Sequence, residues 1–189
     1  MPLFRRLPGG RYALPIAMAA VRMGERVLIM GCGDPKMLAA VATRAGLTGM
    51  IAAVVTSESD KDRLSAAAAG AGLLVEVAVA PGWSGFPHCD QPFDVAVIDG
   101  TRGWFGAMPP ADRLACLSGV FGALRHGGRA LVIERRLSAP KAWLRPARPS
   151  APDYVSAGGA AGGLEAAGFR PVRVLAEQGG WRFVEGLRG

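Results

Sequence analysis

Residues 25–35, with the sequence E-R-V-L-I-M-G-C-G-D-P, determine how the rest of the chain is interpreted. The apolar run 27–30 is typical of a strand that is buried on both faces of a parallel sheet. Two glycines then form a turn that has no Cβ to obstruct a ligand. Asp34 is a good N-cap and Pro35 suits the first helical position, so we expect a helix to begin here. Because a helix N-terminus leaves N–H groups unpaired, the stretch predicts a site for the anionic end of a ligand.

Apolar strand patterns alternate with helical patterns along the rest of the chain. We expect strands at 27–30, 49–56, 73–79, 93–98 and 129–134, followed by a closing hairpin at 170–175 and 181–185. We expect helices at 15–22, at 35–45, at 64–69 after a capping box of Ser59 with Asp62, from Pro109-Pro110 to 126–128, and in a short segment that ends at 164–168. The alternation predicts an α/β fold with a doubly wound, mostly parallel seven-stranded sheet and an antiparallel C-terminal hairpin. We expect an N-terminal arm and helix at 1–24 and one Rossmann-like domain at 25–189.

The composition fits one domain of 189 residues with a substantial core and no transmembrane run. Basic residues followed by an apolar stretch at 12–21 resemble the pattern of a signal peptide. However, P-G-G-R at 8–11 interrupts the pattern, so we favour a helix that covers the sheet. Cys32, Cys89 and Cys116 are odd in number and widely spaced, which argues against a disulfide framework and against a zinc site. We therefore expect a reduced, cytoplasmic environment.

The net charge of +7 comes from arginine, since the chain has only three lysines. Such a charge can attract nucleic acid, anionic lipid or acidic substrates. A coding bias toward arginine and alanine gives the same charge without a polyanionic partner. There is no block of like charges and no RNA-binding motif, so nucleic acid is a possible partner that we do not favour.

Five motifs in order resemble those of the class I S-adenosylmethionine-dependent methyltransferases, from about residue 25 to the C-terminus. V-L-I-M-G-C-G at 27–33 is similar to the family's V-L-D-x-G-C-G, while Lys36 stands where a dinucleotide fingerprint requires its third glycine. The family's fourth-strand motif is similar to F-D-V-A-V-I-D-G at 93–100. Its motif for the following loop and fifth strand is similar to L-R-H-G-G-R-A-L-V-I at 124–133. An acid after the second strand and the closing hairpin complete the resemblance, which implies the methyltransferase fold and S-adenosylmethionine as cofactor.

The resemblance also implies where the cofactor binds. The methionine end of the cofactor would bind at Gly31, Cys32, Gly33 and Asp34. Glu58 would bind the ribose hydroxyls, and the adenine ring would stack on Trp83. The remaining cofactor contacts would be Ser59, Gly82, Asp99 and Gly100. Other interpretations remain open: Glu58 as a solvated acid, Trp83 as ordinary loop packing and Asp99 as the cap of the next turn. Two residues depart from the family, because Ile29 replaces its usual acid and Pro35 its third glycine. These changes predict weaker cofactor binding or a domain that has lost catalysis.

The sequence assigns no catalytic residue firmly, since methyl transfer from a sulfonium depends mainly on alignment. His88 and Asp99 are weak candidates. I-D-G-T-R at 98–102 resembles the I-D-A-D-K of metal-dependent O-methyltransferases, but Thr101 is not acidic and an arginine at 102 cannot act as a base, so we expect no metal.

Aromatic residues after the fourth strand and in the proline-rich stretch 138–155 suggest an acceptor pocket. An aromatic or apolar substrate could pack against Trp104, Trp143 and Tyr154. We favour a methyltransferase acting on a small molecule. An RNA or protein methyltransferase and a non-catalytic binding domain remain the alternatives.

Overall fold

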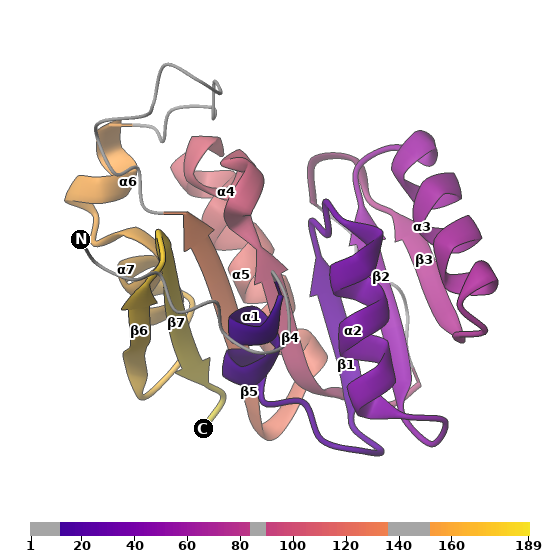
Figure 1. Cartoon of the computed structure of the whole chain (residues 1–189). Helices are drawn as coiled ribbons and strands as arrows, with labels where there is room; N and C mark the ends of the chain where they lie inside the picture. The colour runs from indigo at the N-terminus through magenta and orange to yellow at the C-terminus, as the bar shows by residue number, and fades with distance from the viewer. Residues whose placement is uncertain (1–11, 84–89, 136–151) are drawn as a thin grey trace, which may run out of the picture.

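The computed structural model describes residues 12–83, 90–135 and 152–189 (Figure 1). Their centre is a seven-stranded sheet with the order β3-β2-β1-β4-β5-β7-β6. The strands are β1 (Arg26–Met30), β2 (Met50–Val55), β3 (Val75–Val79), β4 (Phe93–Asp99), β5 (Leu124–Arg135), β6 (Val172–Gln178) and β7 (Trp181–Leu187). Strands β1 to β5 are parallel to one another, whereas β7 runs antiparallel to both β5 and β6. The prediction of a doubly wound parallel sheet with an antiparallel C-terminal hairpin is therefore confirmed.

Helices cover both faces of this sheet (Figure 1). α1 (Ala13–Ala19), α2 (Pro35–Ala45) and α3 (Glu58–Gly70) contribute to the core on one face. α4 (Trp104–Ala107), α5 (Pro110–Ala123), α6 (Pro152–Ser156) and α7 (Gly159–Ala166) contribute to the core on the other. Two short 3₁₀ turns, η1 (Pro81–Trp83) and η2 (Gly100–Arg102), follow β3 and β4. None of the helices in the described ranges is long and apolar enough to cross a membrane.

Strand β1 is buried because it lies in the middle of the sheet. Its side chains alternate between the two cores: Val27 and Ile29 pack on the α2 side, and Leu28 and Met30 on the α5 side. All four are fully buried, and each such side chain contributes about 1.5–3 kcal/mol to folding. This burial holds the turn after β1 in a fixed position.

Several predicted boundaries are wrong by a few residues. Ser57, not Ser59, caps α3, since its side chain accepts a hydrogen bond from the N–H of Asp60 at 3.2 Å. The helix α1 begins and ends earlier than predicted, and β3 starts at Val75 rather than 73. Helix α5 ends at Ala123, and the segment predicted as its last turn belongs to β5.

Candidate functional site

The carboxyl ends of β1 and β4 lie side by side at the centre of the sheet, where the strand order reverses. Open α/β sheets bind ligands at such a switch point. Asp99, the last residue of β4, is only 2% exposed and joins the two turns. Its Oδ2 accepts a hydrogen bond from the Gly33 N–H at 3.2 Å, and its Oδ1 accepts one from the Thr101 N–H at 3.1 Å. The predicted site residues at the two strand ends are thus in contact.

A cavity of about 440 Å³ opens at this switch point, which is within the range of small-ligand sites. It is lined by the glycine turn, the end of β2, the first turn of α3 and the segments after β3 and β4: Gly31, Cys32, Gly33, Val55, Thr56, Asp60, Trp83, Arg102 and Trp104. Five of these residues, the three of the turn and both tryptophans, are among the residues that the sequence singled out.

Two tryptophans close one side of the cavity. The rings of Trp83 and Trp104 stack with centroids 3.9 Å apart and planes 21° apart. Trp104 Nε1 also donates a hydrogen bond to the Asp99 carbonyl oxygen at 2.7 Å. The Trp104 ring lies so close to Gly31 that a Cβ there would be 2.6 Å from its Cζ2 atom. Gly31 also has a φ of +72°, so both its conformation and its surroundings require glycine.

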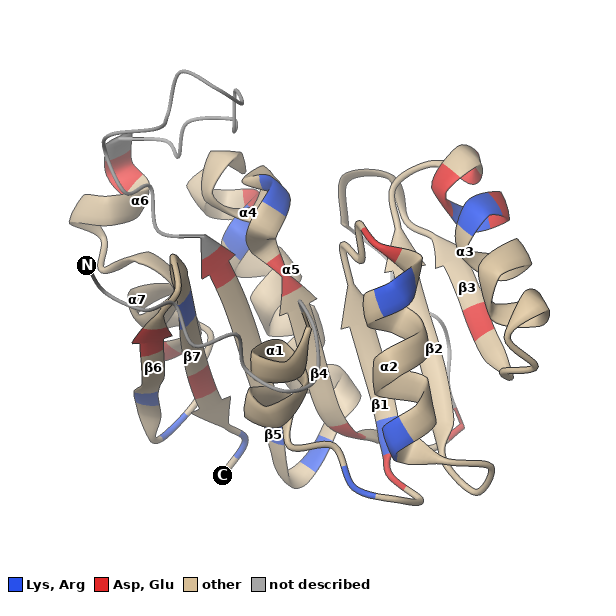
Figure 2. Cartoon of the chain, viewed as in Figure 1, with Lys and Arg blue, Asp and Glu red and all other residues tan. Residues whose placement is uncertain are grey.

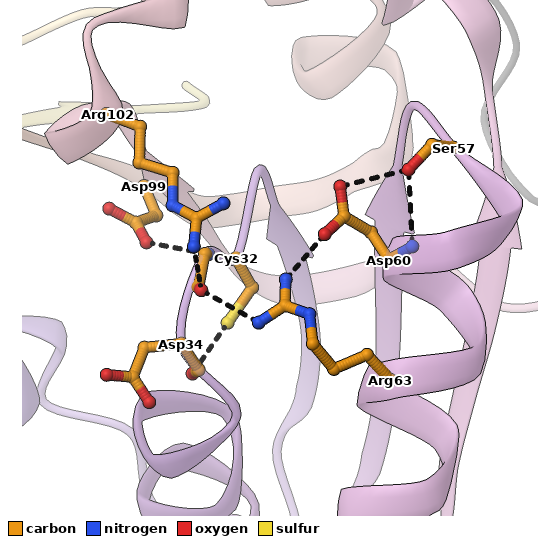
Figure 3. A network of polar contacts seen from close by, with 8 residues as sticks. Cys32, Asp34, Ser57, Asp60, Arg63, Asp99 and Arg102 are labelled. Atoms are coloured by element: carbon orange, nitrogen blue, oxygen red, sulfur yellow. Dashed lines mark hydrogen bonds and ion pairs between the residues drawn. The ribbon is translucent and has the colours of Figure 1, made fainter.

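Two arginines converge on the turn from opposite sides (Figure 3). Arg63 of α3 and Arg102 of η2 donate hydrogen bonds to the Gly33 carbonyl oxygen, at 3.2 Å and 2.5 Å. Arg63 also pairs with Asp60 at 2.5 Å. The hydrogen bond from Arg63 holds the pKa of Asp60 below its usual value, and the Ser57 hydroxyl, 3.0 Å away, adds to this effect. Asp60 is therefore a carboxylate at neutral pH.

The prediction of unpaired amides at the start of α2 is wrong for Gly31, Gly33 and Lys36. The Gly31 N–H donates to the Val54 carbonyl at 3.1 Å, and Asp99 accepts from Gly33. Asp34 acts as the N-cap, as predicted, and its Oδ1 accepts from the Lys36 N–H at 2.9 Å. Tyr12 at the start of α1 donates its hydroxyl to the other oxygen of Asp34. The protein's own groups therefore already satisfy these amides.

Cys32 lies within the turn and is buried. It is 2% exposed, and its Sγ is 3.4 Å from the Asp34 carbonyl oxygen, to which it donates. Burial, and next the negative charge of Asp99, raises the pKa of Cys32 to about 12. The thiol is therefore neutral under physiological conditions.

The residues predicted after β2 lie outside the cavity. The side chain of Glu58 is 71% exposed and pairs with Lys61 at 3.4 Å, and Ser59 is also exposed. With Ser57 as the cap, it is Asp60 of α3 that lines the cavity. Gly82 lies in η1 next to Trp83, and Gly100 begins η2.

The predicted acceptor residues are dispersed. Tyr154 is 5% exposed and does not line the cavity; its hydroxyl donates to Glu134, and the Arg113 guanidinium lies 4.5 Å from its ring centroid. His88 and Trp143 lie outside the described residues. Among the described residues there is no group of three or more His, Cys, Asp or Glu side chains that could hold a metal ion.

Sequence reasoning missed Val55, Thr56, Asp60 and Arg63 at this site. Asp60 and Arg63 carried a usable signal, since Ser57 with Asp60 is as good a capping pattern as Ser59 with Asp62. A cap at Ser57 would have indicated which α3 side chains face the turn.

Solved structures with a similar fold include several methyltransferases. A SAM-dependent methyltransferase from Aquifex aeolicus is 20% identical with a TM-score of 0.68, and the match covers 89% of this chain and 85% of that one. A protein from Clostridium thermocellum assigned as an rRNA methylase is 14% identical with a TM-score of 0.62, and 88% of each chain is covered. A SAM-dependent O-methyltransferase from Thermotoga maritima is 16% identical with a TM-score of 0.62, over 92% of this chain and 63% of that one. No family model matches the sequence, and no curated protein matches it significantly.

The chain has the SAM-dependent methyltransferase fold. Within this fold, Ile29 stands at the position where the sequence resemblance places an acid. Its side chain is fully buried in the core on the α2 side and does not line the cavity. Asp99, Arg63 and Arg102 contribute side-chain hydrogen bonds to Gly33 of the turn.

Proposed function

We propose that the protein is an S-adenosylmethionine-dependent methyltransferase that acts on a small-molecule acceptor. The observation that carries this proposal is the cavity at the switch point of a methyltransferase fold. It places a glycine turn, two aromatic rings and the carboxylate of Asp60 around one space. The alternatives are an RNA or protein methyltransferase and a non-catalytic binding domain.

The residues around the cavity fit the parts of this cofactor. Trp83 offers a ring face for adenine, and Thr56 and Asp60 offer oxygen atoms for the ribose hydroxyls. Trp104 and Arg102 fill the space beside Gly31 and Gly33, so the methionine end would approach the turn as these side chains move. The stacked rings are only 3.9 Å apart, so adenine can use the inner face of Trp83 only after Trp104 moves away. Trp104 would therefore have to move when the ligand binds.

The protein would contribute positioning rather than acid–base chemistry. The bound cofactor supplies a methyl group on a sulfonium, and holding it in line with the acceptor atom is the main catalytic requirement. Cys32 stays neutral and does not compete as a methyl acceptor. Asp99 fixes the relative position of the two turns through its two backbone hydrogen bonds. We retain Trp143 as a predicted acceptor contact and His88 as a predicted base.

The distribution of charge supports a small acceptor over RNA. Lysine and arginine are scattered over the described elements rather than gathered on one face in the view of Figure 2. Several arginines form ion pairs with carboxylates, as Arg125 does with Asp94 at 2.5 Å and Arg173 with Glu185 at 2.8 Å. These ion pairs occupy individual arginines, and the net charge of +7 remains. Cys32 and Cys116 are free thiols, which supports our proposal of a reduced, cytoplasmic location.

Isothermal titration calorimetry with S-adenosylmethionine and S-adenosylhomocysteine tests the proposed activity class. We expect both to bind, and we expect no binding of NAD, because the turn lacks the dinucleotide fingerprint. Absence of heat with both methionine nucleosides at millimolar concentration would refute the methyltransferase proposal. Binding of NAD alone would reassign the cavity to a dinucleotide.

RNA binding measured over a range of salt concentrations tests the acceptor class. A small-molecule enzyme should bind RNA weakly and without specificity. An RNA methyltransferase instead makes several phosphate contacts, and its affinity falls steeply as salt rises. Tight binding with that steep dependence would favour the RNA alternative.

A further inference from the structure

The anionic end of a ligand in this cavity lacks the partner that the fold would ordinarily suggest. The N–H groups of Gly31, Gly33 and Lys36 are already hydrogen-bonded within the protein. The group bonded to Gly33 is the carboxylate of Asp99, which would repel a second carboxylate at the same place. The anionic end therefore needs a donor other than these three N–H groups.

Arg102 has the properties that such a donor requires. It lines the cavity and is exposed, and among the described residues it forms one hydrogen bond, to the Gly33 carbonyl oxygen, and no ion pair. A guanidinium has five N–H donors, so most of them remain available. Arg63 differs in this respect, because its charge is already paired with Asp60 at 2.5 Å.

The position of Arg102 places this charge directly at the glycine turn. A Cβ on Gly33 would lie 2.8 Å from both Cδ and Cζ of Arg102, so the guanidinium lies against the backbone there. Its bond to a neutral carbonyl is a weaker interaction than a bidentate pair with a carboxylate. An arriving carboxylate would therefore displace the Gly33 carbonyl as the partner of Arg102 with little movement of the backbone.

We propose that Arg102 binds the carboxylate of the cofactor's methionine moiety, and that Arg63 supports it by holding the Gly33 carbonyl. This inference rests on the proposed function, since it assumes that a methionine nucleoside enters the cavity. It assigns to one side chain the role that unpaired amides would otherwise have. It also explains how the turn can bind the cofactor although the N–H groups of Gly31 and Gly33 are occupied.

The test compares S-adenosylhomocysteine with its decarboxylated analogue, which lacks only the carboxylate. Calorimetry should show that the wild-type protein prefers S-adenosylhomocysteine by at least tenfold. In Arg102→Ala this preference should fall to less than threefold, and in Arg102→Lys it should be intermediate, because lysine keeps the charge but loses the fork geometry. Lys36→Ala is the matched control: it removes an exposed positive charge near the turn that does not line the cavity, and it should keep the wild-type preference.

Each outcome bears on the inference separately from the proposed function. If S-adenosylhomocysteine binds the wild type and Arg102→Ala keeps the wild-type preference, the role of Arg102 is refuted while the proposed function stands. Tighter binding of both ligands to Arg102→Ala would show that Arg102 only blocks the turn, and would also refute it. If the wild type binds neither ligand, both proposals fail. Circular dichroism of each variant confirms that it is folded, and an exposed side chain such as Arg102 is suited to this substitution.

Discussion

Replacement of Gly31 by alanine should destabilise the protein more than its backbone conformation alone explains. Its φ of +72° costs a residue with a Cβ about 1–2 kcal/mol. The new Cβ would lie 2.5–2.6 Å from Cε2 and Cζ2 of Trp104, so the ring must move. That movement breaks the Trp104 hydrogen bond to Asp99, worth about 0.5–1.5 kcal/mol, and the stack on Trp83, worth about 0.5–1.5 kcal/mol. The total loss in the free energy of unfolding is about 2–5 kcal/mol.

Gly72 provides a matched control for this substitution. Its φ is +67°, and a Cβ there meets no atom within 4 Å, so Gly72→Ala should cost only the conformational part, about 1–2 kcal/mol. Urea unfolding followed by circular dichroism measures both variants. In a Trp104→Ala background the excess cost of Gly31→Ala should disappear. Equal losses for the two glycine variants, or an excess that persists without the ring, would refute the contact between Trp104 and the turn.

The other predictions concern the carboxylates and the rings of the same site. Asp99→Asn should lower the free energy of unfolding by about 1.5–3 kcal/mol, because one of two backbone N–H groups would face an amide N–H₂; a loss below 0.5 kcal/mol on urea unfolding would contradict this. Arg63→Ala should raise the pKa of Asp60 in a carboxyl NMR titration. Since the folded-state pKa of Asp60 is depressed, the stability that this pair contributes is present at neutral pH and is lost as pH falls through that pKa; an unshifted titration would exclude the pairing. Trp83→Ala should weaken S-adenosylhomocysteine binding by about 1–3 kcal/mol, whereas Trp104→Ala should strengthen it; weakening by both would make Trp104 a ligand contact.

The sheet was predictable because its strands are continuous apolar runs. The run 27–30 is fully buried in β1, and the hairpin of β6 and β7 follows its predicted positions closely. Boundaries were less predictable where two local signals compete. Ser57 with Asp60 and Ser59 with Asp62 are the same capping pattern two residues apart, and only the end of β2 at Val55 decides between them.

That two-residue difference also explains why Asp60 was not singled out at the candidate site. A cap at Ser57 turns the first exposed acid, Glu58, toward solvent and places Asp60 at the cavity. The hydrogen bonds of the glycine turn could not be predicted from the sequence, for a different reason. Their partners, Asp99 and Val54, come from other strands, and only the assembled sheet brings them within reach.

A crystal structure of the protein with S-adenosylhomocysteine tests the central claim most directly, namely that the cavity between the ends of β1 and β4 is a methionine nucleoside site. We predict that the ligand lies in this cavity, with adenine on Trp83 and Trp104 displaced from the position it has here. Ligand density elsewhere, or a Trp83–Trp104 stack that remains closed at saturating ligand, would contradict the claim.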